Sequence, residues 1–118
     1  EFVTCALLGL SVAVITDRRN RVPEMARPLL FALSFILICI AFSSHTTDVP
    51  PMNPARDFAP RIFATMLYGF DTFVFHNYYF WIPVIASFPG ITFGGWLYQL
   101  AIGAHIPDED EARSSPNC

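Results

Sequence analysis

The sequence contains little charge and no lysine. Of its 118 residues, 14% are charged and 53% are hydrophobic, whereas a typical soluble domain is about 25% charged. This shortage of charge favours a membrane protein, and the length allows one domain at most.

The few cations and cysteines exclude several functional classes. Seven arginines against ten acidic residues give a net charge of −3 without a basic stripe, so no nucleic-acid partner is expected. The three cysteines lack the spacing of a zinc site or a disulfide framework and are interpreted as small hydrophobic residues. No Ser/His/Asp set or metal-binding cluster has a meaningful spacing either. We therefore predict no catalysis, no metal and no cofactor.

The sequence also lacks the features of a signal peptide. It begins with Glu1, not Met, and leads directly into an apolar run without a basic region or a small-residue cleavage site. The simpler interpretation is a fragment that begins inside a helix. A carboxylate in such a helix is costly in lipid unless it is paired.

Three long apolar runs predict helices that cross a membrane. The first, ending at residue 16, falls short of a hydrocarbon core of about 30 Å. It is either buried in a soluble core or completed by further N-terminal residues, and the other two runs favour the second option. The third run has no charged residue and carries aromatic residues near both ends, as interfacial belts do. The predicted spans are about 1–16, 26–44 and 78–104.

Four of the seven arginines lie in the link 17–28. The positive-inside rule therefore predicts that this link is cytoplasmic. The link 43–77 then lies on the extracellular side, and the tail returns to the cytoplasm. This tail, residues 107–118, contains a run of four acidic residues and is interpreted as a solvated, disordered end.

The link 43–77 contains a well-defined helix start. Asn53 is a favoured N-cap, and Pro54 is favoured at the next position. Apolar residues then recur at helical spacing over residues 54–68, which is long enough to cross about half of a membrane and a little more. Pro60 should bend this helix and leave the Arg56 carbonyl without its helical partner. A backbone carbonyl without a hydrogen-bond partner is tolerated inside a membrane only where protein covers it or it faces water. We therefore predict a re-entrant half-helix facing a water-filled path.

The third run carries small residues four positions apart, at Ala86, Gly90 and Gly94. This spacing predicts close contact with another helix. Ser87 or Thr92 is expected to add a hydrogen bond between helices, and Pro83 and Pro89 are expected to kink the span.

The nine residues from Asn53 to Arg61 read Asn-Pro-Ala-Arg-Asp-Phe-Ala-Pro-Arg. They resemble the second signature motif of the major intrinsic proteins, and their extension is similar to the aquaglyceroporin branch, which usually has Gly in place of Ala59. The resemblance covers residues 1–106 and corresponds to the C-terminal of two inverted repeats. It implies an all-α membrane protein, half of an aquaporin-like right-handed helical bundle, with three transmembrane helices plus one re-entrant half-helix.

The resemblance also implies a function, a passive channel for water, glycerol and other small neutral solutes. The implied partners are the lipid bilayer, the N-terminal repeat of the same protein and further copies in a homotetramer. Asn53, Pro54 and Ala55 are the implied pore signature, and Arg56 is the implied cation of the selectivity filter. Selectivity of the aquaporin type rests on pore diameter, lining hydrogen-bond groups and an electrostatic barrier, which the helix dipole and Arg56 would supply.

Several positions match glycerol-conducting members of this family. Asp57 and Arg61 follow the signature at the expected spacing, and we expect them to pair with each other. Pro83 and Val84 match the last helix. Ala41 stands where water-only channels often place His, which implies a wider filter.

The segment before the signature departs from the family pattern. Pro50 replaces the aromatic residue of the glycerol filter. Pro-Pro favours extended backbone with free carbonyls, so Val49 and Pro51 are still expected to line the pore with carbonyls. By the same resemblance, Glu1 braces the re-entrant loop.

Two alternative functions stay open at this stage. Pro50 is compatible with a water-selective or solute-divergent pore, and the missing repeat is compatible with a non-conducting truncated membrane subunit. An upstream second Asn-Pro-Ala motif would favour the channel, whereas a true start at Glu1 would favour the truncated subunit. The alternative role for Arg56 is a structural ion pair with Asp57 or Glu1.

Overall fold

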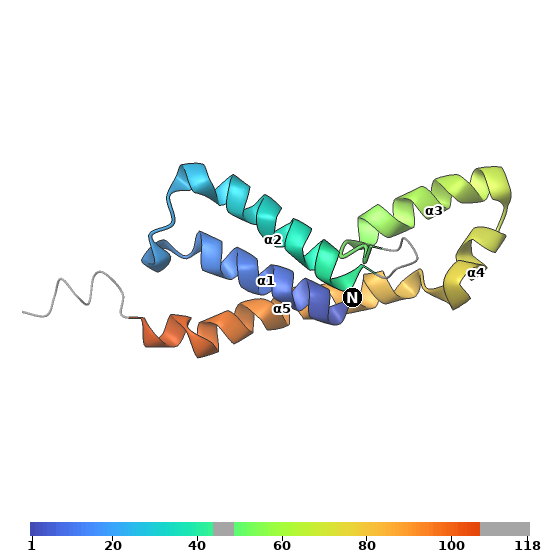
Figure 1. Cartoon of the computed structure of the whole chain (residues 1–118). Coiled ribbons are helices and arrows are strands. Elements are labelled where there is room, and N and C mark those ends of the chain that lie inside the picture. Colours follow the sequence, from blue (N-terminus) through green and yellow to red (C-terminus); the bar gives the residue numbers. More distant parts are fainter. Residues whose placement is uncertain (44–48, 107–118) are drawn as a thin grey trace, which may run out of the picture.

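The computed structural model describes residues 1–43 and 49–106, and this part is helical, as predicted (Figure 1). Residues 44–48, in the link that the sequence predicts to be extracellular, and the predicted tail 107–118 lie outside the described residues. The α-helices are α1 (Phe2–Thr16), α2 (Arg27–Phe42), α3 (Pro54–Tyr68), α4 (Asp71–Tyr78) and α5 (Trp81–Ala101).

Helices α1 and α5 form the main contact of the fold, side by side (Figure 1). Gly90 and Gly94 of α5 are buried there. A Cβ atom on Gly90 would lie 2.6 Å from the Phe2 carbonyl oxygen, and one on Gly94 would collide with the Ala6 backbone. The predicted small-residue contact is therefore confirmed. Helix α1 contributes Gly9, which faces the Ile91 backbone and was not predicted.

The other expectations for α5 are met only in part. Thr92 Oγ1 donates to the Phe88 carbonyl of its own helix at 2.9 Å. Ser87 Oγ is buried without a hydrogen-bond partner among the described residues, so the expected hydrogen bond between helices is absent there. Pro83 lies in the first turn of α5, where a missing N–H breaks no helical bond. The expected kink at Pro83 is therefore wrong, whereas Pro89 does lie inside the helix.

The region before α5 contains a helix that the sequence did not indicate. Helix α4 ends at Tyr78, because Asn77 and Tyr78 have positive φ angles of 54° and 63° and left-handed residues cannot continue a right-handed helix. Helix α5 then begins at Trp81, later than the predicted start of the third span.

One helical stretch in the described part of the chain is long and apolar enough to cross a membrane by length and composition. It is Glu24–Phe42, of which only 6% is buried. Helix α1 is apolar but shorter. Helix α5 has 21 residues, but its Pro, Gly, Trp and Tyr residues make it less apolar than the α2 stretch.

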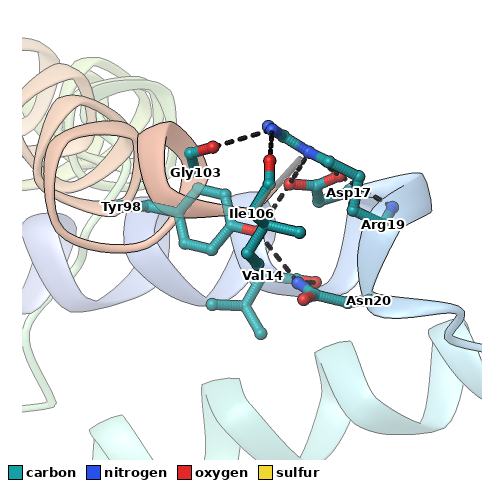
Figure 2. Close-up of polar contacts among 7 residues, drawn as sticks. All are labelled: Val14, Asp17, Arg19, Asn20, Tyr98, Gly103 and Ile106. Atoms are coloured by element: carbon teal, nitrogen blue, oxygen red, sulfur yellow. Dashed lines mark hydrogen bonds and ion pairs between the residues drawn. The ribbon is translucent and has the colours of Figure 1, made fainter. Parts of the chain in front are cut away.

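A polar cluster fastens the α1–α2 link to the end of α5 (Figure 2). Arg19 Nη1 donates to the carbonyls of Gly103 at 2.7 Å and Ile106 at 3.0 Å. The Asp17 carboxylate accepts from Arg19 Nε at 3.2 Å and from the Tyr98 hydroxyl at 2.6 Å. A cation suits the carbonyl-rich end of a helix, so this arginine has a structural role besides its place in the basic link.

The N-terminus, the end of α2 and the start of α3 lie close together (Figure 1). Helix α3 leaves this point beside α4 and contains no buried residue. A buried cluster of Cys5, Ile38 and Met52 joins α1, α2 and the segment before α3. This junction positions the candidate site.

Candidate functional site

Asn53 begins α3 with the predicted cap. Its backbone is extended, and its side-chain Oδ1 accepts a hydrogen bond from the Ala55 N–H at 2.9 Å. Its carbonyl accepts from the Arg56 N–H at 3.1 Å. Pro54 occupies the first helical position, where no donor is lost. Because Oδ1 serves the cap, the two N–H donors of the exposed Asn53 amide are left for another partner.

A cleft of about 560 Å³ lies beside this helix start. It brings together residues from the N-terminus, the end of α2, the loop before α3 and α3 itself. The lining residues are Glu1, Thr4, Phe42, Val49, Pro50, Pro51, Arg56, Asp57, Arg61 and Tyr79. Most of the charged and loop residues that the sequence singled out therefore share one cavity.

The two arginines of this cleft have different partners. Arg61 Nε and Nη2 donate to the Asp57 carboxylate at 2.8 and 3.1 Å, and Arg61 Nη1 donates to the Thr72 carbonyl of α4 at 3.1 Å. The predicted pairing of Asp57 with Arg61 is thus confirmed. Arg56 is exposed, and no ion pair reaches it within residues 1–43 and 49–106. Arg56 therefore lines the cleft as a cation that makes no ion pair in this part of the chain, although Glu1 and Asp57 line the same cleft.

Glu1 joins three segments at the edge of the cleft. Its Oε2 accepts from the Met52 N–H at 3.1 Å, and its Oε1 accepts from the Tyr79 hydroxyl at 2.9 Å. The carboxylate is therefore paired, as its position in an apolar helix requires. Its contact with Met52 places it directly against the loop that carries Asn53.

The remaining predicted residues lie elsewhere. Pro54, Ala55 and Val84 line a second groove of about 510 Å³, whose lining is wholly apolar. Pro83 is fully buried. Ala41 is exposed near the end of α2, and its neighbour Phe42 lines the cleft instead.

Sequence reasoning missed Met52 and Tyr79. Met52 has a φ of 51°, and no sequence pattern marks a methionine for a left-handed conformation. Tyr79 stands in a run of aromatic residues that also suits a membrane interface. Its contact depends on a turn before α5, and the only sequence signal for that turn is the Asn before the aromatic run.

Comparisons with known proteins agree on one family. The family model described as major intrinsic protein matches residues 1–98. The chain is 36% identical to Aquaporin-9 of Mus musculus over 98% of this chain and 40% of that protein. It is also 36% identical to Aquaglyceroporin-3 of Trypanosoma brucei brucei, over 84% of this chain and 32% of that protein. The chain thus spans about two fifths or less of these relatives. No solved structure matches it.

Proposed function

Because the chain belongs to the major intrinsic protein family, we propose that it forms the C-terminal half of a passive channel for water, glycerol and other small neutral solutes. Family membership makes it a helical integral membrane protein and a channel component, not an enzyme. Relatives named aquaglyceroporin support glycerol as a solute.

The observation that carries the proposal is the geometry of Asn53. Its Oδ1 already accepts from the Ala55 N–H in the helix cap, which leaves its NH2 group to donate to a passing solute. The start of α3 also bears the positive end of the helix dipole. An oxygen of water or glycerol would accept from the Asn53 amide, whereas the positive end of the helix dipole would oppose a cation there. Pro54 and Ala55 complete the signature.

The cleft supports a selectivity filter beside the signature. Arg56 and Pro50 line it together, and within residues 1–43 and 49–106 Arg56 makes no ion pair. The carbonyls of Val49 and Pro51 would line the path beside them, and Ala41 would leave the filter wide. The Asp57–Arg61 pair would hold the first turns of α3, and Pro83 and Val84 would fit the glycerol branch at α5.

The proposal requires partners that supply the rest of the pore. The N-terminal repeat of the same protein would bring a second half-helix to meet α3, and four copies would form a homotetramer. In this arrangement the basic link 17–28 and the tail face the cytoplasm, and the link 43–77 faces outward.

The test uses the full-length protein in liposomes. Asn53→Asp keeps a capping oxygen but replaces the amide donor with a charge. We expect the unchanged protein to raise water and glycerol permeability, and Asn53→Asp to lower glycerol permeability by roughly two- to tenfold, the equivalent of one hydrogen bond. Gln99→Glu, the same exchange of an amide for a carboxylate at an exposed position near the end of α5, serves as the control. If the protein without substitutions gives no more glycerol flux than empty liposomes, the glycerol function is refuted.

Pro50 supports a second candidate, a water-selective or solute-divergent pore. It lines the cleft with Arg56 at the place of the family's filter aromatic. Under this alternative, Pro50→Tyr changes the ratio of water to glycerol permeability in the same liposomes. An unchanged ratio of water to glycerol permeability would show that Pro50 does not determine selectivity. Absence of both fluxes would favour a non-conducting membrane subunit.

A further inference from the structure

The residue immediately before the signature has an unusual backbone. Met52 adopts a φ of 51°, in the left-handed region that side chains other than Gly rarely occupy. Such a conformation costs about 1–3 kcal/mol and persists only where surrounding contacts impose it. It also decides the direction in which the chain enters Asn53 and α3.

Three contacts hold Met52 in this conformation. Its N–H donates to Glu1 Oε2 at 3.1 Å, and its carbonyl accepts from Cys5 Sγ at 3.7 Å. Its side chain is 3% exposed and packs in the buried cluster with Cys5 and Ile38. Both backbone polar groups and the side chain are therefore fixed, mostly by α1.

The Glu1 carboxylate is in turn held by Tyr79. The Tyr79 hydroxyl donates to Glu1 Oε1 at 2.9 Å, so the two carboxylate oxygens take donors from two separate segments. Tyr79 reaches this position because Asn77 and Tyr78, both with positive φ, turn the chain between α4 and α5. With this phenol removed, Glu1 would keep its bond to Met52 but lose the contact that fixes its orientation.

We propose that Tyr79 is a positioning residue for the pore signature, acting through the Glu1 carboxylate on the backbone of Met52. The turn between α4 and α5 thereby sets the place of Asn53, and with it the solute preference of the pore. This inference rests on the proposed channel function for its effect on solutes, but the positioning itself is a structural property that can be measured separately.

The first experiment compares Tyr79→Phe with Tyr78→Phe in the full-length protein. Each change removes one phenol oxygen, and Tyr78 is exposed with no hydrogen bond from its side chain found in the described part of the chain. The readout is the ratio of glycerol to water permeability in the same liposomes, which does not depend on how much protein is folded. We expect Tyr79→Phe to change this ratio by roughly two- to tenfold, the worth of one hydrogen bond, and Tyr78→Phe to leave it unchanged.

The second experiment tests the route through Glu1. In a Glu1→Gln background, the hydroxyl of Tyr79 has no carboxylate to hold, so Tyr79→Phe should have a smaller effect than in the unchanged protein. An equal effect in both backgrounds would show that Tyr79 does not act through Glu1. If the protein conducts and Tyr79→Phe leaves its ratio of glycerol to water permeability unchanged, the positioning role is wrong and the channel function stands.

The third measurement is independent of transport. Hydrogen exchange of the segment 49–53, which contains the Met52 amide, should accelerate in Tyr79→Phe and not in Tyr78→Phe, since Glu1 is then held less firmly. Unchanged exchange would overturn the positioning role even in a protein that does not conduct. Faster exchange in a non-conducting protein would support the positioning and refute the channel function.

Discussion

Two arginines five positions apart in α3 have opposite environments. Arg61 is partly buried against Asp57, with a side-chain exposure of 13%, and also donates to the Thr72 carbonyl of α4. Arg56 is exposed and faces the cleft. The same type of side chain therefore joins α3 to α4 in one case and, within residues 1–43 and 49–106, makes no ion pair in the other.

The first prediction compares Arg61→Gln with Arg56→Gln. Removing Arg61 leaves the Asp57 carboxylate without its charged donor, so we expect the free energy of unfolding to fall by about 1.5–3 kcal/mol. Arg56→Gln should change it by less than about 0.5 kcal/mol, as surface substitutions usually do. Thermal unfolding of the full-length protein in detergent, followed by circular dichroism, measures both. Equal losses in the two variants would contradict the different roles.

The second prediction concerns Asp17 at the end of α1. The Tyr98 hydroxyl and the Arg19 backbone N–H both donate to its carboxylate and hold its pKa below the ordinary value. The folded state therefore favours the charged form, and the stabilisation is fully present above the unfolded pKa of about 3.9. It is lost as the pH falls through the lowered folded pKa.

Melting temperatures of the unchanged protein and Asp17→Asn between pH 7 and pH 2 test this sign. The unchanged protein should be the more stable at neutral pH, and the difference should shrink in acid. Glu24→Gln, at a carboxylate with 89% side-chain exposure, is the control and should show a smaller change. A difference that grows as the pH falls would show that the sign is wrong.

For single residues, the sequence predicted those contacts that a side chain makes with its near neighbours in the chain. Asn53 caps α3 because its side chain reaches a neighbouring N–H, and Asp57 meets Arg61 one turn later on the same helix face. Met52 and Tyr79 could not be predicted in this way. Both residues contact Glu1, from which Met52 is 51 and Tyr79 is 78 residues away in the sequence. These contacts therefore depend on how all the helices are arranged.

At the element scale, the contact between α1 and α5 depends on glycines. Gly94 and Gly95 are neighbours in α5, but only Gly94 faces α1. A Cβ atom on Gly94 would collide with the Ala6 backbone, whereas one on Gly95 would meet nothing within 4 Å. A change to Ala at either glycine therefore has the same effect on helix propensity, but only the change at Gly94 disturbs the contact with α1.

The third prediction uses this pair. We expect Gly94→Ala to lower the free energy of unfolding by about 1–3 kcal/mol, because the helices must move apart. Gly95→Ala should be neutral or stabilising by up to about 1 kcal/mol, since Ala is the better helix former. Thermal unfolding in detergent gives both values. Similar destabilisation by the two variants would contradict the glycine contact.

The sequence predicted the helical elements better than their ends and junctions. Periodicity and the four-residue spacing of small residues indicated the close approach of α5 to another helix. They left α1 unidentified as that helix, although Gly9 and Ala13 stand at the same four-residue spacing there, because spacing within one helix does not show which helix it meets. Helix α4 was missed as a separate helix because it is divided from α5 by positive φ angles at Asn77 and Tyr78. The aromatic-rich sequence around these residues does not reveal such angles.

At the scale of the whole molecule, the described chain leaves much apolar surface uncovered. Only 6% of the apolar stretch Glu24–Phe42 is buried, and α3 has no buried residue. Apolar surface of this extent is stable in lipid or against another protein surface. It agrees with family membership and with a chain that spans two fifths or less of its relatives.

The central claim is that these 118 residues carry one half of a pore. The most direct test measures glycerol entry into liposomes that contain either the full-length protein or residues 1–118 alone, at equal protein content. We expect glycerol entry with the full-length protein and only background entry with residues 1–118, because a single half-helix does not complete the path. Glycerol flux through residues 1–118 alone, or none through the full-length protein, would contradict it.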